Sequence, residues 1–188
     1  MLFRKNPNDL NKKYRKVETL LNTQYSDLYS GQTVLGKWLR SKPVVITINN
    51  KLFVHGGISF EVVRKKLTVK QINRTFANKI IGKDLQSVYS DEQLKFLCHA
   101  NGPLWYRGYF EDKGFCEDKL RAILDFYGKG HIIVGHTPCV EIDAVFNNRI
   151  IGVDTGLQYK HPGEMLIYRD GAFYRSTGPG SRIRIGSP

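Results

Sequence analysis

Apolar positions recur at helical spacing in several stretches of the chain, and these stretches predict its helices. The pattern favours helices over about Asp9–Asn22 and Thr33–Ser41, and a largely helical region between Phe60 and His99. A further helix is expected over Glu117–Tyr127, with Gly128 as its stop because glycine readily takes the left-handed conformation that ends helices. Helices therefore dominate the first two thirds of the sequence.

Two helix starts in the middle region carry the capping-box pattern. Thr68 is followed three residues later by Gln71, and Ser90 is followed in the same way by Gln93. In this pattern the hydroxyl and the amide side chain satisfy backbone groups that a helix start leaves unpaired. We therefore expect helices to begin at Thr68 and at Ser90.

Short β-branched runs joined by Asn-Asn or Asp-Gly pairs predict hairpins, because these pairs tolerate left-handed backbone. The first strand begins after Pro43, covers Val44–Ile48 and turns at Asn49-Asn50 into Leu52–Val54. The remaining strands are expected at Ile132–Val134, at Ala144–Phe146 turning at Asn147-Asn148 into Ile150–Val153, and at Met165–Tyr168 turning at Asp170-Gly171 into Phe173–Tyr174. Helices followed by hairpins indicate an α/β (α+β) fold with a mixed sheet.

Length and composition indicate one globular domain. With 188 residues, 41% of them hydrophobic, the chain can bury a sizeable core without metal or disulfide support. We expect a single domain over residues 1–175 and a flexible basic tail over 176–188, which is rich in Gly, Pro and Ser. Cys98, Cys116 and Cys139 form no Cys-x-x-Cys pair, so the sequence predicts reduced thiols.

The basic charge favours anionic partners. A formal net charge of +12 keeps a nucleic-acid-binding domain open as an alternative, but Lys and Arg are spread along the chain and no nucleic-acid motif is present. No apolar run approaches the roughly 20 residues of a membrane span, and no signal peptide follows Met1, so a cytoplasmic protein without a membrane partner is expected.

Two histidines follow apolar strands in similar settings. LFVHGGIS places His55 at a strand end before two glycines, and IIVGHTP places His136 just beyond another strand. Either histidine alone would suit a hydrogen-bonded structural role. Imidazoles at the ends of two neighbouring strands, however, can converge on one metal ion, while the following loops leave room for a substrate.

Four motifs together resemble a known family. HGGIS, LWYRG (Leu104–Gly108), VGHTP and VDTGL (Val153–Leu157), in this order, are similar to the C-terminal half of calcineurin-like metallophosphoesterases. The resemblance is to the Shewanella-like bacterial phosphoprotein phosphatases and the symmetrical diadenosine tetraphosphatases. It implies a β-sandwich flanked by helices, of which this chain would form the C-terminal portion of the catalytic domain.

The resemblance also implies an activity and a set of site residues. It implies a metal-dependent phosphoester hydrolase of the serine/threonine phosphoprotein phosphatase type, with two divalent ions (manganese, iron or zinc). His55 and His136 would ligate the second metal, Arg107 would bind the phosphate, and Tyr106 and Asp154 would lie beside the substrate. The substrate would be a phosphorylated protein or a small phosphoester.

Two of these motifs have a structural alternative. LWYRG would also suit a buried Leu104/Trp105 anchor whose arginine pairs with a surface acid. VDTGL would also suit a tight turn in which Asp154 caps backbone N–H groups.

The sequence departs from the family in lacking its upstream motifs. It contains no Gly-Asp pair, no Asp-x-His and no Asn-His pair, so the other metal ligands and the general-acid histidine are missing. We therefore expect the chain alone to be inactive, with compensating ligands to be sought among Glu141, Asp143, Asp154 and Glu164. Three explanations stay open: a reading frame begun at an internal methionine, a fragment or split enzyme completed by an N-terminal half, and a pseudophosphatase that binds phosphorylated partners.

Overall fold

The structure divides into two compact units that meet between Lys42 and Pro43. It is a computed structural model that describes residues 14–16 and 18–186. The single domain predicted over 1–175 stays a prediction.

The first unit is a small helical cluster. Residues 14–16 and 18–21 are helical, and they are followed by the 3₁₀ helix η1 (Tyr25–Tyr29) and by α2 (Val34–Arg40). The Thr33 hydroxyl accepts a hydrogen bond from the Gly36 N–H at 3.0 Å, which confirms the helix predicted over Thr33–Ser41. Residues 9–13 and 17 of the other predicted helix lie outside the described residues.

A five-stranded mixed sheet forms the centre of the second unit. Its strand order is β1-β2-β3-β5-β4, in which β2, β3 and β5 are parallel and the two outer strands are antiparallel. The strands are β1 (Val45–Ile48), β2 (Lys51–Val54), β3 (His131–Val134), β4 (Asp143–Val145) and β5 (Ile150–Gly152). Both predicted hairpins of this sheet are confirmed, with left-handed backbone at Asn49, Asn147 and Asn148.

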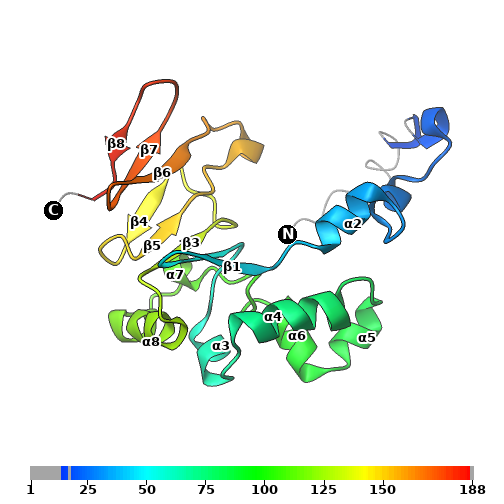
Figure 1. Cartoon of the computed structure of the whole chain (residues 1–188), viewed down its shortest axis with the longest axis horizontal. Helices are drawn as coiled ribbons and strands as arrows, with labels where there is room; N and C mark the ends of the chain where they lie inside the picture. The colour runs from blue at the N-terminus through cyan, green and yellow to red at the C-terminus, as the bar shows by residue number, and fades with distance from the viewer. Residues whose placement is uncertain (1–13, 17, 187–188) are drawn as a thin grey trace. The chain divides into compact units, whose positions relative to one another are not determined.

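The two faces of this sheet are covered by different layers (Figure 1). Leu52, Val54 and Ile132 face the larger core, which the helices between β2 and β3 complete. Ile133 and Ile151 face a second core with Phe173 of the other sheet. Burial on both faces explains why the central strands are continuous apolar runs instead of alternating ones.

The helical layer lies mostly within the crossover between β2 and β3. Its elements are α3 (Phe60–Arg64), α4 (Val69–Thr75), the π-helix η2 (Phe76–Ile80), α5 (Leu85–Tyr89), α6 (Glu92–Cys98), α7 (Gly108–Glu111) and α8 (Glu117–Tyr127). The Thr68–Gln71 capping box is confirmed, and Gly128 ends α8 with a φ of 59°. No helix in the described part of the chain has the length and apolar character needed to cross a membrane.

The helix start predicted at Ser90 is wrong by one residue. Asp91 is the N-cap of α6, and its carboxylate accepts hydrogen bonds from the N–H groups of both Gln93 and Leu94. Ser90 instead ends α5, with its hydroxyl donating to the Ser87 carbonyl at 2.9 Å. A carboxylate that accepts two N–H bonds at a helix start outcompetes a neighbouring hydroxyl.

A second, three-stranded sheet follows the 3₁₀ helix η3 (Leu157–Tyr159). It is antiparallel, in the order β6 (Met165–Arg169), β7 (Ala172–Ser176), β8 (Ile183–Arg184). The predicted hairpin at Asp170-Gly171 is confirmed. The segment predicted to be a flexible tail contains β8, because the Gly/Pro-rich residues after Ser176 form a turn that returns the chain to β7.

Candidate functional site

His55 and His136 lie side by side beyond the ends of two neighbouring strands. His55 directly follows β2, and His136 follows β3 after one glycine, with Val54 and Val134 paired in parallel register. The Gly135 N–H donates to the His55 carbonyl at 2.9 Å, which extends this pairing up to the two histidines. The ring centroids are 4.8 Å apart. The structure therefore brings together the two imidazoles that the sequence singles out.

The backbone at His136 is strained. Its φ is +66°, and the Thr137 N–H donates to the Gly135 carbonyl at 2.7 Å, so His136 is the central residue of a γ-turn. A side chain other than glycine in this conformation costs about 1–3 kcal/mol, and such residues cluster at functional sites. The turn aims the imidazole at His55 instead of along the strand.

The environment of His136 favours a neutral ring with a free nitrogen. The residue is 8% exposed, and its buried Nε2 has no hydrogen-bond partner among the described residues. Burial, the Arg107 guanidinium and His55 together lower the pKa of His136 to about 4, and the Asp154 carboxylate only partly opposes them. A neutral imidazole with an unpartnered nitrogen is the form that ligates metals.

The two glycines after His55 allow the LWYRG segment to lie against this site. A Cβ on Gly56 would lie 2.8 Å from the Leu104 carbonyl carbon, and one on Gly57 would lie 2.8 Å from the Tyr106 ring. The N–H groups of both glycines donate to the Pro103 carbonyl, at 2.8 and 3.2 Å. The HGG and LWYRG motifs, about 50 residues apart in the chain, are thus two sides of one junction.

Trp105, for which the sequence offers a role as a packing anchor, also lies at this site. Its ring meets His136 edge to face, with centroids 5.2 Å apart and an interplanar angle of 84°. The contact restricts the orientation of the imidazole. Its position inside LWYRG was the available signal, but the sequence could not show which residue the indole would meet.

Arg107 is a partly exposed residue of the LWYRG motif. It precedes α7, its side chain is 34% exposed, and its guanidinium lies 3.9 Å from the Glu111 carboxylate. This weak ion pair agrees with the structural alternative for LWYRG. The positive charge of Arg107 nevertheless contributes to the lowered pKa of His136, after burial.

Tyr106 and Asp154 have evident structural roles. Tyr106 is 8% exposed and packs edge to face on Tyr109, and burial raises its pKa. One Asp154 carboxylate oxygen accepts the Gly156 N–H at 3.0 Å, and its carbonyl accepts the Cys139 N–H at 2.8 Å. These contacts favour packing for Tyr106 and a tight turn for Asp154, and substrate contact stays a prediction for both.

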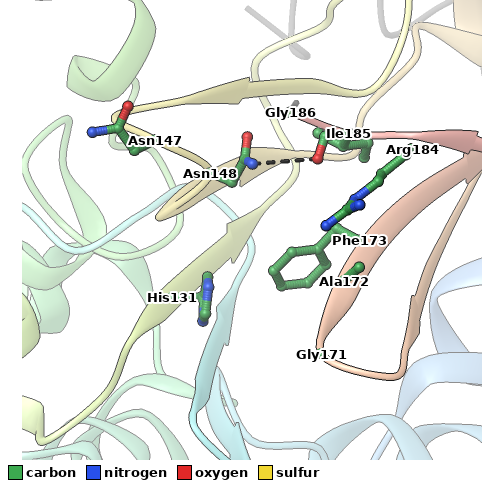
Figure 2. Close-up of a pocket in the computed structure, with 9 residues that line it drawn as sticks. All are labelled: His131, Asn147, Asn148, Gly171, Ala172, Phe173, Arg184, Ile185 and Gly186. Atoms are coloured by element: carbon green, nitrogen blue, oxygen red, sulfur yellow. Dashed lines mark hydrogen bonds between the residues drawn. The ribbon is translucent and has the colours of Figure 1, made fainter. Parts of the chain in front are cut away.

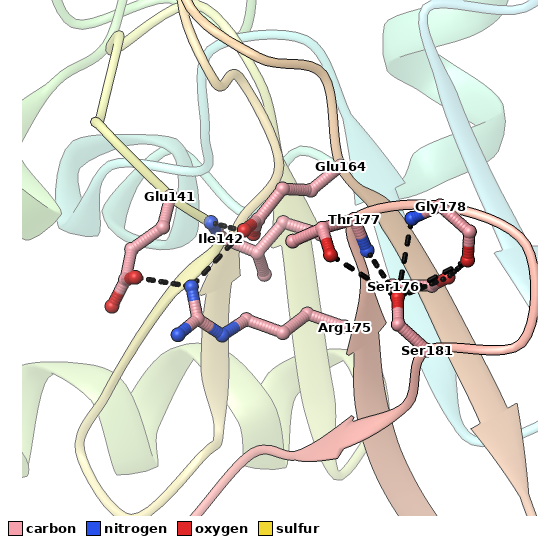
Figure 3. Close-up of polar contacts among 8 residues, drawn as sticks. All are labelled: Glu141, Ile142, Glu164, Arg175, Ser176, Thr177, Gly178 and Ser181. Carbon is pink, nitrogen blue, oxygen red and sulfur yellow. Dashed lines mark hydrogen bonds and ion pairs between the residues drawn. The ribbon is translucent and has the colours of Figure 1, made fainter.

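Two of the acids considered as compensating ligands are instead paired with one arginine (Figure 3). Arg175 of β7 forms ion pairs with Glu141 and with Glu164, and the other Glu164 oxygen accepts the Ile142 N–H at 2.8 Å. This network fixes the loop that follows His136 to the second sheet. Within the described residues, no group of three or more His, Cys, Asp or Glu side chains gathers around a point that could hold a metal ion.

Comparison with known proteins extends these observations. No family model matches the sequence. The Shewanella-like protein phosphatase 1 of Plasmodium berghei (strain Anka) is 27% identical over 142 residues, which cover 72% of this chain and 38% of the relative.

Solved structures match over more of the chain. The cold-active protein-tyrosine phosphatase of a psychrophilic Shewanella species superposes with a TM-score of 0.85 and 36% identity, covering 93% of this chain and 52% of that one. A second structure, of a cold-active protein tyrosine phosphatase at 1.1 Å, gives a TM-score of 0.83 and 37% identity. This chain spans about half the length of these phosphatases or less. In sequence and in fold it fits the Shewanella-like phosphatase family of metallophosphoesterases, matching a C-terminal part of these proteins.

Proposed function

We propose that this chain carries part of the active site of a metal-dependent phosphoester hydrolase. In this proposal His55 and His136 hold one divalent ion and Arg107 binds the phosphoryl group. The convergence of the two imidazoles carries the proposal, because the two ring centroids are 4.8 Å apart and the buried His136 Nε2 has no partner among the described residues. Similarity to phosphatases supports the reaction class.

The residues present fit a metal but do not complete its site. Imidazole suits manganese, iron and zinc, and a catalytic metal site of the zinc type has three protein ligands and an open position. Two histidines supply part of such a set, so we propose that the remaining ligands come from residues outside the described part of this chain or from another chain. A bound divalent ion would supply Lewis acidity toward a phosphoryl oxygen.

The part assigned to this chain is binding and orientation. The strained turn at His136 and the edge contact with Trp105 hold the imidazole in one orientation before a ligand arrives. The planar guanidinium of Arg107 can donate two parallel hydrogen bonds to phosphoryl oxygens, and these strengthen as negative charge builds on the group in transfer. Neither the orientation of the His136 imidazole nor the hydrogen bonds of Arg107 require a change in the fold.

We propose a phosphoprotein as the substrate, with phosphotyrosine tested first. The solved neighbours are named as tyrosine phosphatases, whereas the sequence motifs favour the serine/threonine type. Turnover of phosphotyrosine, phosphoserine and phosphothreonine forms of one peptide distinguishes the two.

The test restores a complete site by fusion. The N-terminal half of the Shewanella phosphatase is joined to this chain, and metal content and turnover of p-nitrophenyl phosphate are measured. His55→Ala and His136→Ala should each remove most activity and one metal equivalent per chain. His99→Ala, which removes an exposed histidine at the end of α6, is the matched control and should change neither.

Retention of both metal equivalents in the two variants would show that the histidines are structural. The unfused chain should show no turnover with manganese. A pseudophosphatase is a second candidate function, and it is favoured because no group of three or more metal-ligating side chains gathers in the described region. In that case the unfused chain should still bind phosphate through Arg107.

A further inference from the structure

A small polar pocket lies where the two sheets of the second unit meet (Figure 2). Its volume is about 210 Å³, which suits a small ligand and not a drug-sized one. Four segments contribute to it: the start of β3, the β4–β5 turn, the β6–β7 turn, and β8 with the residues after it. The lining residues are His131, Asn147, Asn148, Gly171, Ala172, Phe173, Arg184, Ile185 and Gly186. No carboxylate is among them.

The strands behind the pocket place three basic residues in one row. Lys51 of β2 pairs in register with His131 of β3. Arg149 directly precedes Ile150 of β5, which pairs with Ile132, the next residue of β3. Burial of the ring, and after it the charges of Lys51 and Arg149, lower the pKa of His131. Arg149 is neutralised by an ion pair with Glu117. Lys51 forms no ion pair with a described carboxylate.

Lys51 is an unusual residue for its position. It is 6% exposed, although lysine is almost never fully buried without a partner. Its ammonium lies 3.3 Å from the centroid of the Tyr168 ring and 5.6 Å from that of Phe173, which lines the pocket. Aromatic faces compensate the lost hydration of the ammonium only in part. An anion in the pocket would supply the missing counter-charge.

Arg184 completes the basic surroundings. In Figure 2 its guanidinium extends inward from β8 toward Phe173 and His131. It forms no ion pair with a described carboxylate. Asp170 is the acidic residue that precedes Gly171 of the pocket lining, and its carboxylate forms an ion pair with Arg169 at 3.2 Å. The pocket therefore has an open arginine in its lining and a buried lysine near one lining residue, Phe173, while Asp170 and Glu117 are paired with other arginines.

We propose that this pocket binds a phosphate group, either free orthophosphate or the phosphate of a phosphorylated side chain. The Arg184 guanidinium offers a planar fork to two oxygens, and Lys51 provides charge from behind Phe173. The Asn148 amide nitrogen is already engaged with the Ile185 carbonyl at 3.3 Å and holds the pocket wall in place.

This site is separate from the histidine pair. His131 begins β3, whereas His136 follows the other end of that strand. At roughly 3.3 Å per residue, β3 alone separates the two places by about 10 Å. The proposal therefore does not depend on the proposed function, and binding at each place can be followed separately.

The experiment titrates the metal-free full chain with sodium phosphate at constant ionic strength and follows its amide NMR spectrum. We expect saturable shifts at Gly171 and Gly186, which line the pocket. Shifts confined to Gly56 and Gly135, beside the histidines, would instead place the phosphate at Arg107 and overturn the proposal. Absence of saturable shifts at Gly171 and Gly186 would also overturn it.

Two variants and one control test the residues. Arg184→Gln should weaken phosphate binding about tenfold, the loss expected for one charge-assisted hydrogen bond. Arg182→Gln removes the same charge from an exposed arginine two residues away that does not line the pocket, and should leave the affinity within about twofold. Equal weakening by both would show a diffuse charge effect and overturn the proposal.

Lys51→Met tests the buried charge, with circular dichroism as the check of folding. A folded variant should lose most phosphate affinity, and unchanged affinity would contradict the role of Lys51. If this variant does not fold, the comparison of Arg184→Gln with Arg182→Gln still tests whether the pocket binds phosphate. Competition by O-phosphoserine and O-phosphotyrosine then distinguishes free orthophosphate from a phosphorylated side chain as the ligand. Displacement of orthophosphate by either amino acid shows that the pocket accepts a phosphorylated side chain.

Discussion

Gly56 is the position where one methyl group tests the junction between the two motifs of the candidate site. An alanine Cβ there would lie 2.8 Å from the Leu104 carbonyl carbon and 2.9 Å from the Trp105 nitrogen. Both atoms belong to the backbone, so no flexible side chain can move aside. The strand carrying His55 and the loop carrying Arg107 must separate.

The cost of Gly56→Ala can be worked from three contributions. Overpacking in a rigid environment costs about 1–3 kcal/mol. Weakening the 2.8 Å hydrogen bond from the Gly56 N–H to Pro103 adds about 1 kcal/mol. The reduced conformational freedom of alanine in the unfolded chain stabilises the folded state by about 0.4–1 kcal/mol. The net expectation is a loss of about 2 kcal/mol in the free energy of unfolding, or about 4–8 °C in Tm.

Urea denaturation measures this loss, with Trp105 fluorescence as the probe in a Trp38→Phe background. Trp105 contacts His136 directly, so its emission reports on the junction itself. Gly178→Ala is the matched control in the same unit, because a Cβ there would meet nothing within 4 Å. A loss below about 0.5 kcal/mol for Gly56→Ala, or an equal loss for the control, would refute the steric argument.

Three further outcomes are expected. In the fused enzyme Arg107→Lys should lower kcat/KM by about 10²-fold without loss of metal, because lysine cannot donate a bidentate pair of hydrogen bonds. Replacement of the exposed Arg121 of α8 by lysine is the control and should leave kcat/KM unchanged. Glu164→Ala should lower the free energy of unfolding by about 2–3 kcal/mol in urea, since it leaves the Ile142 N–H and one side of Arg175 unpaired. Because the fold lowers the pKa of His131 below 6.5, the unfolded chain binds the proton more readily, so stability should fall as pH drops below about 6.5. His131→Gln should reduce this fall in parallel denaturation curves and leave the contribution of His136, whose pKa is lowered to about 4.

Local patterns in the sequence were sufficient to predict most elements of the second unit. The Asn49-Asn50 hairpin, the Thr68 cap and the Gly128 stop depend on neighbours within four residues, and the structure confirms all three. The Ser90 cap failed although it is equally local, because Asp91 offered the backbone a stronger acceptor one residue later. Competition between adjacent caps is energetic and cannot be read from one motif.

The candidate site was predictable only where the strands themselves carried the signal. The proximity of His55 and His136 follows from two apolar strands pairing side by side. The ion pairs of Arg175 join β7 to acids 34 and 11 residues away, and nothing in the sequence marks them as partners. Burial of Tyr106 and the edge contact of Trp105 depend on the approach that Gly56 permits, which only the folded backbone reveals.

The pairing of β2 with β3 also constrains when the histidine pair can form. Asn50 and Gly130, which are hydrogen-bonded at the start of these strands, lie 80 residues apart in the chain. Closing a loop of this length costs on the order of 4 kcal/mol before any contact forms, whereas the hairpins close within a few residues. During synthesis at about 5–20 residues per second, His55 leaves the ribosome several seconds before His136. The imidazole pair therefore forms only after the crossover segment has been synthesised, so partly made chains present a single histidine and no joint metal-binding surface.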